Sequence, residues 1–160
     1  METVYLETTI IGHLAGRLLG DPIVAARQRA TRRWWDVQAQ KYRIFISYLV
    51  IDECSGGDTT AVDERLRLIA DLDVVGGSTD ADGLANALIE ANAIPRSEPR
   101  DAMHISLAAT NGVQYLLTWN FRHIANAQLR PLIEATCRLH GYEPPVICTP
   151  DELMGLEING

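Results

Sequence analysis

Lysine is nearly absent from this sequence, because Lys41 is the only one among 14 basic residues and the rest are arginine. A reaction that requires a lysine must therefore use Lys41 or is excluded. Acidic residues outnumber basic ones by 21 to 14, which gives a net charge of −7. Nonspecific binding along nucleic acid draws on clustered positive charge. The composition thus argues against a protein that coats nucleic acid by overall attraction, although a local basic surface remains possible.

Cysteine is also scarce. The three cysteines, Cys54, Cys137 and Cys148, are odd in number and form no C-x-x-C pair, so neither a disulfide framework nor a zinc knuckle is indicated. We expect buried free thiols. Apolar runs long enough to cross a membrane, about 18 residues or more, are missing, and the first residues lack a signal-type pattern. These absences predict a cytoplasmic protein with no membrane association.

The remaining composition, 47% hydrophobic and 22% charged over 160 residues, is that of an ordinary globular protein and predicts one domain spanning residues 1–160. Short apolar strands alternate with helical patterns along the chain, which predicts an α/β domain with a mainly parallel central sheet flanked by helices. We expect strands near 4–7, 43–46, 73–77, 113–119 and 144–149. Helices are expected near 9–19, 21–40, 48–55, 59–72, 78–94, 100–112 and 123–141, with Pro131 a break or restart in the last.

Acidic and amide side chains stand where ligands bind in such sheets. Glu7 ends the first strand and Asn120 follows the fourth, and ligands bind beyond the carboxyl ends of parallel strands. Helical segments add Glu53 and Asp101. Carboxylate oxygens are the ligands that Mg²⁺ and Mn²⁺ prefer, and such an ion can activate water and neutralise charge on a phosphodiester. Spacing alone leaves open the alternative that these acids are merely a solvated face.

Four stretches in order carry a family resemblance: "VYLETTI" (4–10), "ISYLVIDE" (46–53), "DAMHISLAAT" (101–110) and "LLTWNFRHI" (116–124). Together they resemble the motifs of the PIN-domain nucleases, and most closely the VapC-like toxins of bacterial and archaeal type II toxin–antitoxin systems. The "DAMHISLAAT" helix is the most specific of the four. The resemblance covers nearly the whole chain.

This resemblance implies a three-layer α/β/α domain of PIN type, a Mg²⁺- or Mn²⁺-dependent endoribonuclease, an antitoxin partner and a homodimer. Its four catalytic positions fall on Glu7, Glu53, Asp101 and Asn120. Thr8 and Thr118 fall where hydroxyls support the acids.

Two positions depart from the common family pattern. Glu7 replaces an aspartate and is longer by one methylene. Asn120 stands where aspartate is frequent; it offers a carbonyl oxygen but no negative charge. A single metal ion recruited with RNA is therefore expected rather than two. In the expected roles, Glu7 and Asp101 bind the ion, while Glu53 positions or deprotonates the attacking water or joins the metal ligands.

Neighbouring residues leave alternatives open. Asp52 adjoins Glu53, but successive helical residues point about 100° apart, so one of the two is expected at the site, and the family pattern favours Glu53. His104 could pair with Asp101 on a transition metal, although a core histidine with satisfied ring nitrogens is the more common case. The spacing of Cys137 and His140 could suit zinc, but no second pair accompanies them.

Arginines form a local basic segment at "RQRATRRWW" (27–35), where tryptophans are expected to pack in the core. Arg32, Arg33 and Arg122 are candidate contacts to RNA or antitoxin, with solvated arginines as the plain alternative; His123 could also contact phosphate.

Two rival functions compete with the nuclease. One is a PIN-like RNA-binding module that barely cleaves. The other is a phosphotransferase or phospho-receiver domain, which normally uses an aspartate nucleophile near a lysine; Glu7 and Lys41 fit this poorly.

Overall fold

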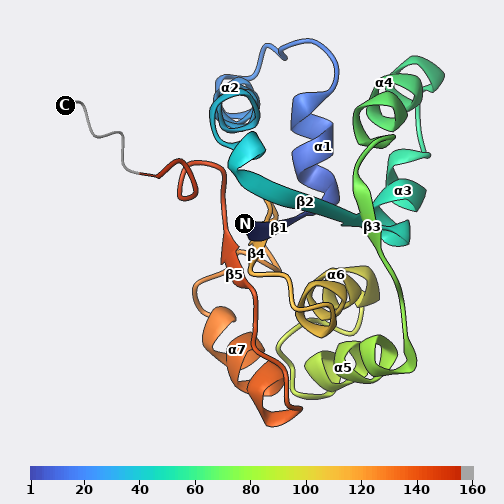
Figure 1. The fold of residues 1–160 in the computed structure, drawn as a ribbon, viewed down its shortest axis with the longest axis vertical. Helices are drawn as coiled ribbons and strands as arrows, with labels where there is room; N and C mark the ends of the chain where they lie inside the picture. Colours follow the sequence, from blue (N-terminus) through green and yellow to red (C-terminus); the bar gives the residue numbers. More distant parts are fainter. Residues whose placement is uncertain (156–160) are drawn as a thin grey trace.

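The computed structural model describes residues 1–155 (Figure 1). Its elements in chain order are β1 (Glu2–Leu6), α1 (Thr8–Leu14), α2 (Pro22–Val37), the 3-10 helix η1 (Ala39–Lys41), β2 (Tyr42–Ser47), α3 (Tyr48–Cys54), α4 (Thr59–Ile69), β3 (Asp73–Val75), α5 (Thr79–Glu90), α6 (Pro99–Thr110), β4 (Tyr115–Leu117), α7 (Arg130–Leu139) and β5 (Val146–Cys148).

The strands form one sheet in the order β3-β2-β1-β4-β5, and every neighbouring pair is parallel. Figure 1 shows α1 to α4 on one side of this sheet and α5 to α7 on the other. The predicted three-layer α/β/α architecture with a parallel sheet is therefore confirmed.

The central strand β1 lies at the point where the strand order reverses, because β2 and β3 follow on one side of it and β4 and β5 on the other. Helices cover both faces, so Val4, Tyr5 and Leu6 are all fully buried and read as a continuous apolar run. In open parallel sheets the crevice beyond such a switch point is the usual place for a ligand. Glu7 directly follows β1 at this end of the sheet.

Helix starts follow the sequence signals. Asp21 caps α2 by accepting hydrogen bonds from the backbone N–H groups of Ile23 and Val24, and Pro22 is its first residue. Ser78 caps α5 through Ala81 N–H. The sequence predicts Asp21 as the cap before Pro22, which is confirmed, and allows either Ser78 or Thr79 as the cap of α5, of which the structure has Ser78.

The predicted helix bounds differ most from the structure at two places, and α5 also ends earlier than predicted, at Glu90 rather than at residue 94. The first helix ends at Leu14 rather than Leu19, because Ala15 is extended and Gly16 adopts a left-handed φ of 77°. The last helix begins at Arg130 with Pro131 at its start, so the restart interpretation of Pro131 is right and 123–129 is not helical. In that segment the N–H groups of Ile124 and Ala125 bond back to the carbonyl of Asn120, which forms tight turns instead.

The core contains the thiols and the first tryptophan of the basic segment. All three cysteines are free and buried, as expected. Trp34 is fully buried, and Trp35 is partly buried against the core. Within residues 1–155, no helix is long and apolar enough to span a bilayer.

Candidate metal and nucleic-acid site

Glu7 is held rigidly at the start of α1. It is the N-cap of that helix and is only 4% exposed. Its Oε2 accepts hydrogen bonds from Thr9 N–H (3.1 Å), from the Thr9 hydroxyl and from the Thr118 hydroxyl (2.8 Å). No hydrogen bond from residues 1–155 reaches its other oxygen, Oε1. The carboxylate therefore joins β1 to the end of β4 through one oxygen and keeps the second for a ligand.

Glu53 is anchored in the same way. Its Oε1 accepts from the Thr8 hydroxyl (2.9 Å) and from Nε2 of His104 (2.5 Å), while Oε2 receives no hydrogen bond from the described residues. Burial alone would raise the pKa of Glu53, but the hydrogen bonds from His104 and from the Thr8 hydroxyl outweigh it, so the pKa of Glu53 is lowered. This carboxylate stays ionised at neutral pH.

Asp52, the neighbour of Glu53, points elsewhere. It forms an exposed ion pair with Arg100 at 2.9 Å, and its side chain is 62% exposed. The two adjacent acids therefore point in different directions, as expected from helical geometry, and Glu53 is the one that contacts Thr8 and His104.

Asp101 lies in the first turn of α6 and is mostly buried. Nδ1 of His123 donates a hydrogen bond to its Oδ2 at 2.9 Å. Glu98, Asp101 and His123 each offer one ligand atom, and these atoms all lie within 4.8 Å of one another. This is the one group of three or more potential metal ligands that residues 1–155 form.

The donor chemistry of that group, two carboxylates and an imidazole, suits a divalent transition-metal ion such as Mn²⁺ better than Mg²⁺, because Mg²⁺ prefers oxygen ligands throughout. Glu7, Glu53 and Asp101 themselves do not form such a compact group among the described residues. Sequence reasoning missed Glu98, although it stands three residues before Asp101, and it considered His123 only as a phosphate contact. An acid one turn from Asp101 was the available clue.

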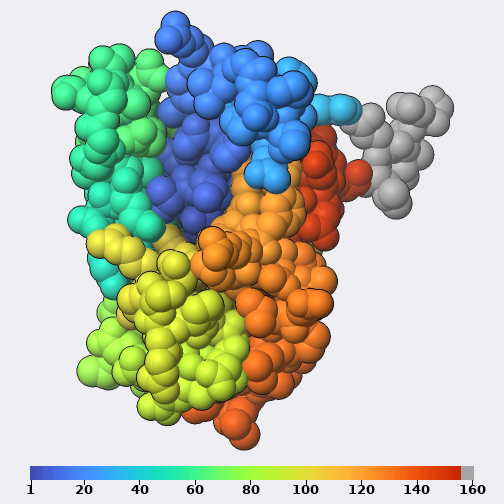
Figure 2. Space-filling model, turned by 180° about the vertical axis from the view of Figure 1, so that it is seen from behind, coloured from blue at the N-terminus to red at the C-terminus, as the bar shows by residue number. Residues whose placement is uncertain are grey.

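Asn120 is tied into the turn after β4. Its backbone N–H donates to the Thr118 hydroxyl (2.9 Å), and its side-chain oxygen accepts from His123 N–H (3.1 Å). Thr118 thus contacts both Glu7 and Asn120, and Asn120 holds the segment carrying His123. A hydrogen-bonded path therefore runs from Glu7 to Asp101 across the ends of β1 and β4. Figure 2 shows the blue amino-terminal, yellow α5–α6 and orange post-β4 segments meeting on one face.

His104 is 1% exposed, and both ring nitrogens have partners, Glu53 and the Tyr5 hydroxyl. The core interpretation of this histidine is confirmed. His140 bonds to the carbonyl of Thr136 and Cys137 is fully buried, so they form no zinc pair in the described chain.

The three candidate arginines differ. The guanidinium of Arg32 donates to the carbonyl of Gly16 at 2.6 Å and ties α2 to the start of the α1–α2 connection. Arg33 and Arg122 are exposed. Arg27, not predicted, lies over the rings of Trp119 (5.7 Å) and Phe121 (5.0 Å), beside Asn120. An arginine and a 43% exposed phenylalanine next to the acids form a surface suited to phosphate and bases.

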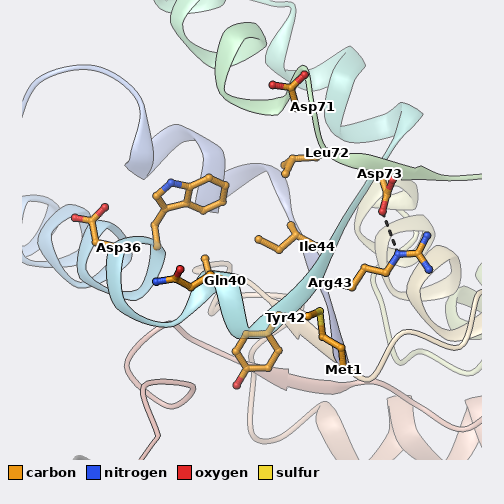
Figure 3. Close-up of a pocket in the computed structure, with 11 residues that line it drawn as sticks. Met1, Asp36, Gln40, Tyr42, Arg43, Ile44, Asp71, Leu72 and Asp73 are labelled. Atoms are coloured by element: carbon orange, nitrogen blue, oxygen red, sulfur yellow. Dashed lines mark hydrogen bonds and ion pairs between the residues drawn. The ribbon is translucent and has the colours of Figure 1, made fainter.

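A groove of about 670 Å³, shown in Figure 3, is lined by none of these acids. It lies at the amino ends of β1 to β3 and is lined by Trp35, Tyr42, Ile44 and Leu72, with Asp71 and Asp73 among its acids. Lys41, just before β2, is at the same amino end. In a parallel sheet this end is opposite Glu7, which argues against a phosphotransferase that would pair Glu7 with Lys41.

A scan of the chain against protein-family models and a search of curated proteins both found no match.

Proposed function

We propose that this protein is a Mg²⁺- or Mn²⁺-dependent endoribonuclease of PIN type that hydrolyses RNA phosphodiester bonds and acts as the toxin of a toxin–antitoxin pair. One observation carries the proposal. Three carboxylates, Glu7, Glu53 and Asp101, lie at or beside the switch point of a parallel sheet, each is anchored through one oxygen, and each keeps the other without a hydrogen bond from residues 1–155.

A surface acid has no need of such anchoring, because water satisfies both oxygens. Anchoring costs side-chain entropy and desolvates negative charge. Holding three carboxylates in fixed positions instead suits a site that must receive a cation and a phosphate without rearrangement. The four sequence motifs that resemble the PIN-domain nucleases supply the same residues.

The proposed ligands of the ion are Asp101, Glu7 and Glu53, directly or through water, with Glu98 and His123 as the groups nearest Asp101. A bound divalent cation would supply positive charge against the scissile phosphate and lower the pKa of water. Asn120 orients His123 rather than adding charge.

Glu53 is better suited to orient the attacking water than to deprotonate it. A general base works best when its pKa is near the working pH, and the pKa of Glu53 is lowered instead. Its Oε2 would accept a hydrogen bond from water. The water oxygen would then attack phosphorus and release one proton to solvent as the P–O bond to the leaving oxygen breaks. The leaving oxygen takes up a proton from solvent.

RNA would approach over Arg27, Phe121 and Arg122, where a guanidinium and an aromatic ring can contact backbone and base. The proposed antitoxin would cover the same acidic crevice, and the proposed homodimer leaves it open to RNA.

The proposal is tested by RNA cleavage with Mg²⁺ or Mn²⁺, comparing wild type with Asp101→Asn and with Asp52→Asn as a matched control. We expect wild type and Asp52→Asn to cleave equally. Asp101→Asn should lose roughly 100-fold or more, because even groups that only orient metal ligands typically contribute about 10- to 100-fold. Equal cleavage by Asp101→Asn would remove the site assignment. A wild type that binds RNA without cleaving it would instead support the binding-module alternative.

A further inference from the structure

A chain of buried polar groups runs from the core to Glu53. The Ser47 hydroxyl lies 2.8 Å from the Tyr5 hydroxyl, which lies 2.7 Å from Nδ1 of His104, and Nε2 of His104 contacts Glu53 Oε1. Ser47 and Tyr5 are fully buried. The four residues come from β2, β1, α6 and α3, so the hydrogen-bonded series begins in the sheet and joins it to one helix of each layer.

The direction of hydrogen-bond donation along these four side chains follows from which of their atoms carry a proton. Burial raises the pKa of Tyr5 far above its ordinary value, so the phenol keeps its proton. Ser47 Oγ is the N-cap of α3 and accepts a hydrogen bond from Leu49 N–H at 3.2 Å. Among the described residues, the Tyr5 oxygen is the acceptor within reach of the Ser47 proton.

Ser47 therefore donates to Tyr5, and Tyr5 donates to Nδ1 of His104. An Nδ1 that accepts carries no proton, so the neutral ring has its proton on Nε2 and donates it to Glu53. In the reverse direction, with Nδ1 protonated, Tyr5 would donate to Ser47. The serine proton would then have no acceptor in a fully buried place, which is unfavourable.

This series of hydrogen bonds ends on Oε1 of Glu53. His104 and Thr8 both donate to Oε1 of Glu53, and the rotation of that carboxylate is thereby fixed. We propose that Tyr5 and His104 are positioning residues: Tyr5 sets the tautomer and ring orientation of His104, and His104 holds Glu53 so that its Oε2 remains for the water of the active site. The catalytic part of this inference rests on the proposed ribonuclease function, whereas the tautomer part does not.

A purely structural role for His104 makes a different prediction. In that case its loss lowers stability, and the folded fraction retains full activity. A positioning role instead lowers kcat of the folded protein while the KM for RNA stays constant, because the RNA-contacting surface is unchanged. Removing residues that orient a functional ligand typically costs about 10- to 100-fold in activity.

The first experiment is nitrogen NMR of the His104 ring in the full chain at neutral pH. We expect the neutral Nε2–H tautomer in wild type and a shifted Nδ1 resonance in Tyr5→Phe, which removes the donor. Tyr42→Phe is the matched control, because it removes a tyrosine hydroxyl from the neighbouring strand β2, and it should leave the His104 resonances unchanged. A ring protonated on Nδ1 in wild type would overturn the proposed direction.

The second experiment compares His104→Gln with His104→Leu in the RNA cleavage assay, with folding of each verified by circular dichroism. The glutamine amide can donate near the place of Nε2–H, so we expect His104→Gln to retain most of kcat and His104→Leu to lose about 10- to 100-fold. Folded His104→Leu with wild-type kcat would overturn the positioning role and leave the nuclease proposal standing. A wild type without RNA cleavage would refute the proposed function and with it the catalytic role, and the NMR result would still decide the tautomer.

Discussion

Replacing Thr118 by valine tests whether Glu7 is anchored as described. Thr118 is fully buried, and its hydroxyl donates to Glu7 Oε2 (2.8 Å) and accepts from Asn120 N–H (2.9 Å). Valine has nearly the same shape, so the change leaves no cavity and removes only these two hydrogen bonds. The resulting loss of stability therefore measures how much these hydrogen bonds, which join the end of β4 to the start of α1, contribute to the free energy of unfolding.

The expected cost follows from the two partners left behind. A hydrogen bond to a charged group contributes about 1.5–3 kcal/mol, and a buried N–H without an acceptor costs about 1–3 kcal/mol. Glu7 keeps its two hydrogen bonds from Thr9, so losing the hydrogen bond from Thr118 costs less than it would for a carboxylate without other donors. We expect Thr118→Val to lower the free energy of unfolding by about 2–4 kcal/mol, which lowers Tm by roughly 2–4 °C for each kcal/mol in a chain of this size.

The measurement is urea unfolding followed by circular dichroism, with Thr136→Val as the matched control. Thr136 is also buried, but its hydroxyl only bonds back to the carbonyl of Leu132 within α7. Such a bond adds little to helix stability, so we expect a loss below about 1 kcal/mol. Equal losses from the two substitutions, at unchanged m-value, would refute the anchoring of Glu7 by Thr118.

Three further predictions concern other parts of the molecule. Because the pKa of Glu53 is lowered on folding, the contribution of this carboxylate to stability is fully present above its ordinary pKa and is lost as pH falls through the lowered pKa. In Glu53→Gln, the free energy of unfolding should therefore depend less steeply on pH in the acidic range, and the same slope as in wild type would contradict this. Arg122→Glu should weaken RNA binding at unchanged Tm. Arg138→Glu, which removes the exposed ion pair of Arg138 on α7 with Glu143 and so lowers Tm slightly, should leave RNA affinity unchanged; equal RNA affinity in both variants would count against the proposed approach of RNA. Burial raises the pKa of Cys148 to about 12, so a thiol reagent at neutral pH should label it only after unfolding, and rapid labelling of native protein would show that the thiol is accessible.

The fold was largely predictable from the sequence because strands such as 4–7 and 43–46 are short, apolar and bounded by clear helix signals. The Asp21–Pro22 start and the Ser78 cap are local features, and both are present in the structure. The predicted helix over 123–129 failed because Asn120 and Asn126 draw backbone N–H groups into turns, which compete with the helical pattern of that segment.

The candidate site was only partly predictable. Glu7, Glu53 and Asp101 could be named because they end strands or stand in motifs. Their supporting contacts join residues far apart in the chain, such as Tyr5 with His104, and no local spacing encodes such a pair. Glu98 was missed because an acid before a helix is ordinarily a solvated charge.

RNA cleavage by protein stripped of metal, before and after Mn²⁺ is added, tests the central claim most directly. Wild type should be inactive without the ion and active with it, and Glu7→Asp should keep activity that Glu7→Gln loses, because aspartate retains a carboxylate while glutamine lacks the charge. Cleavage that needs no divalent ion, or that proceeds equally in Glu7→Gln, would contradict the assignment of these acids to a metal-dependent ribonuclease site.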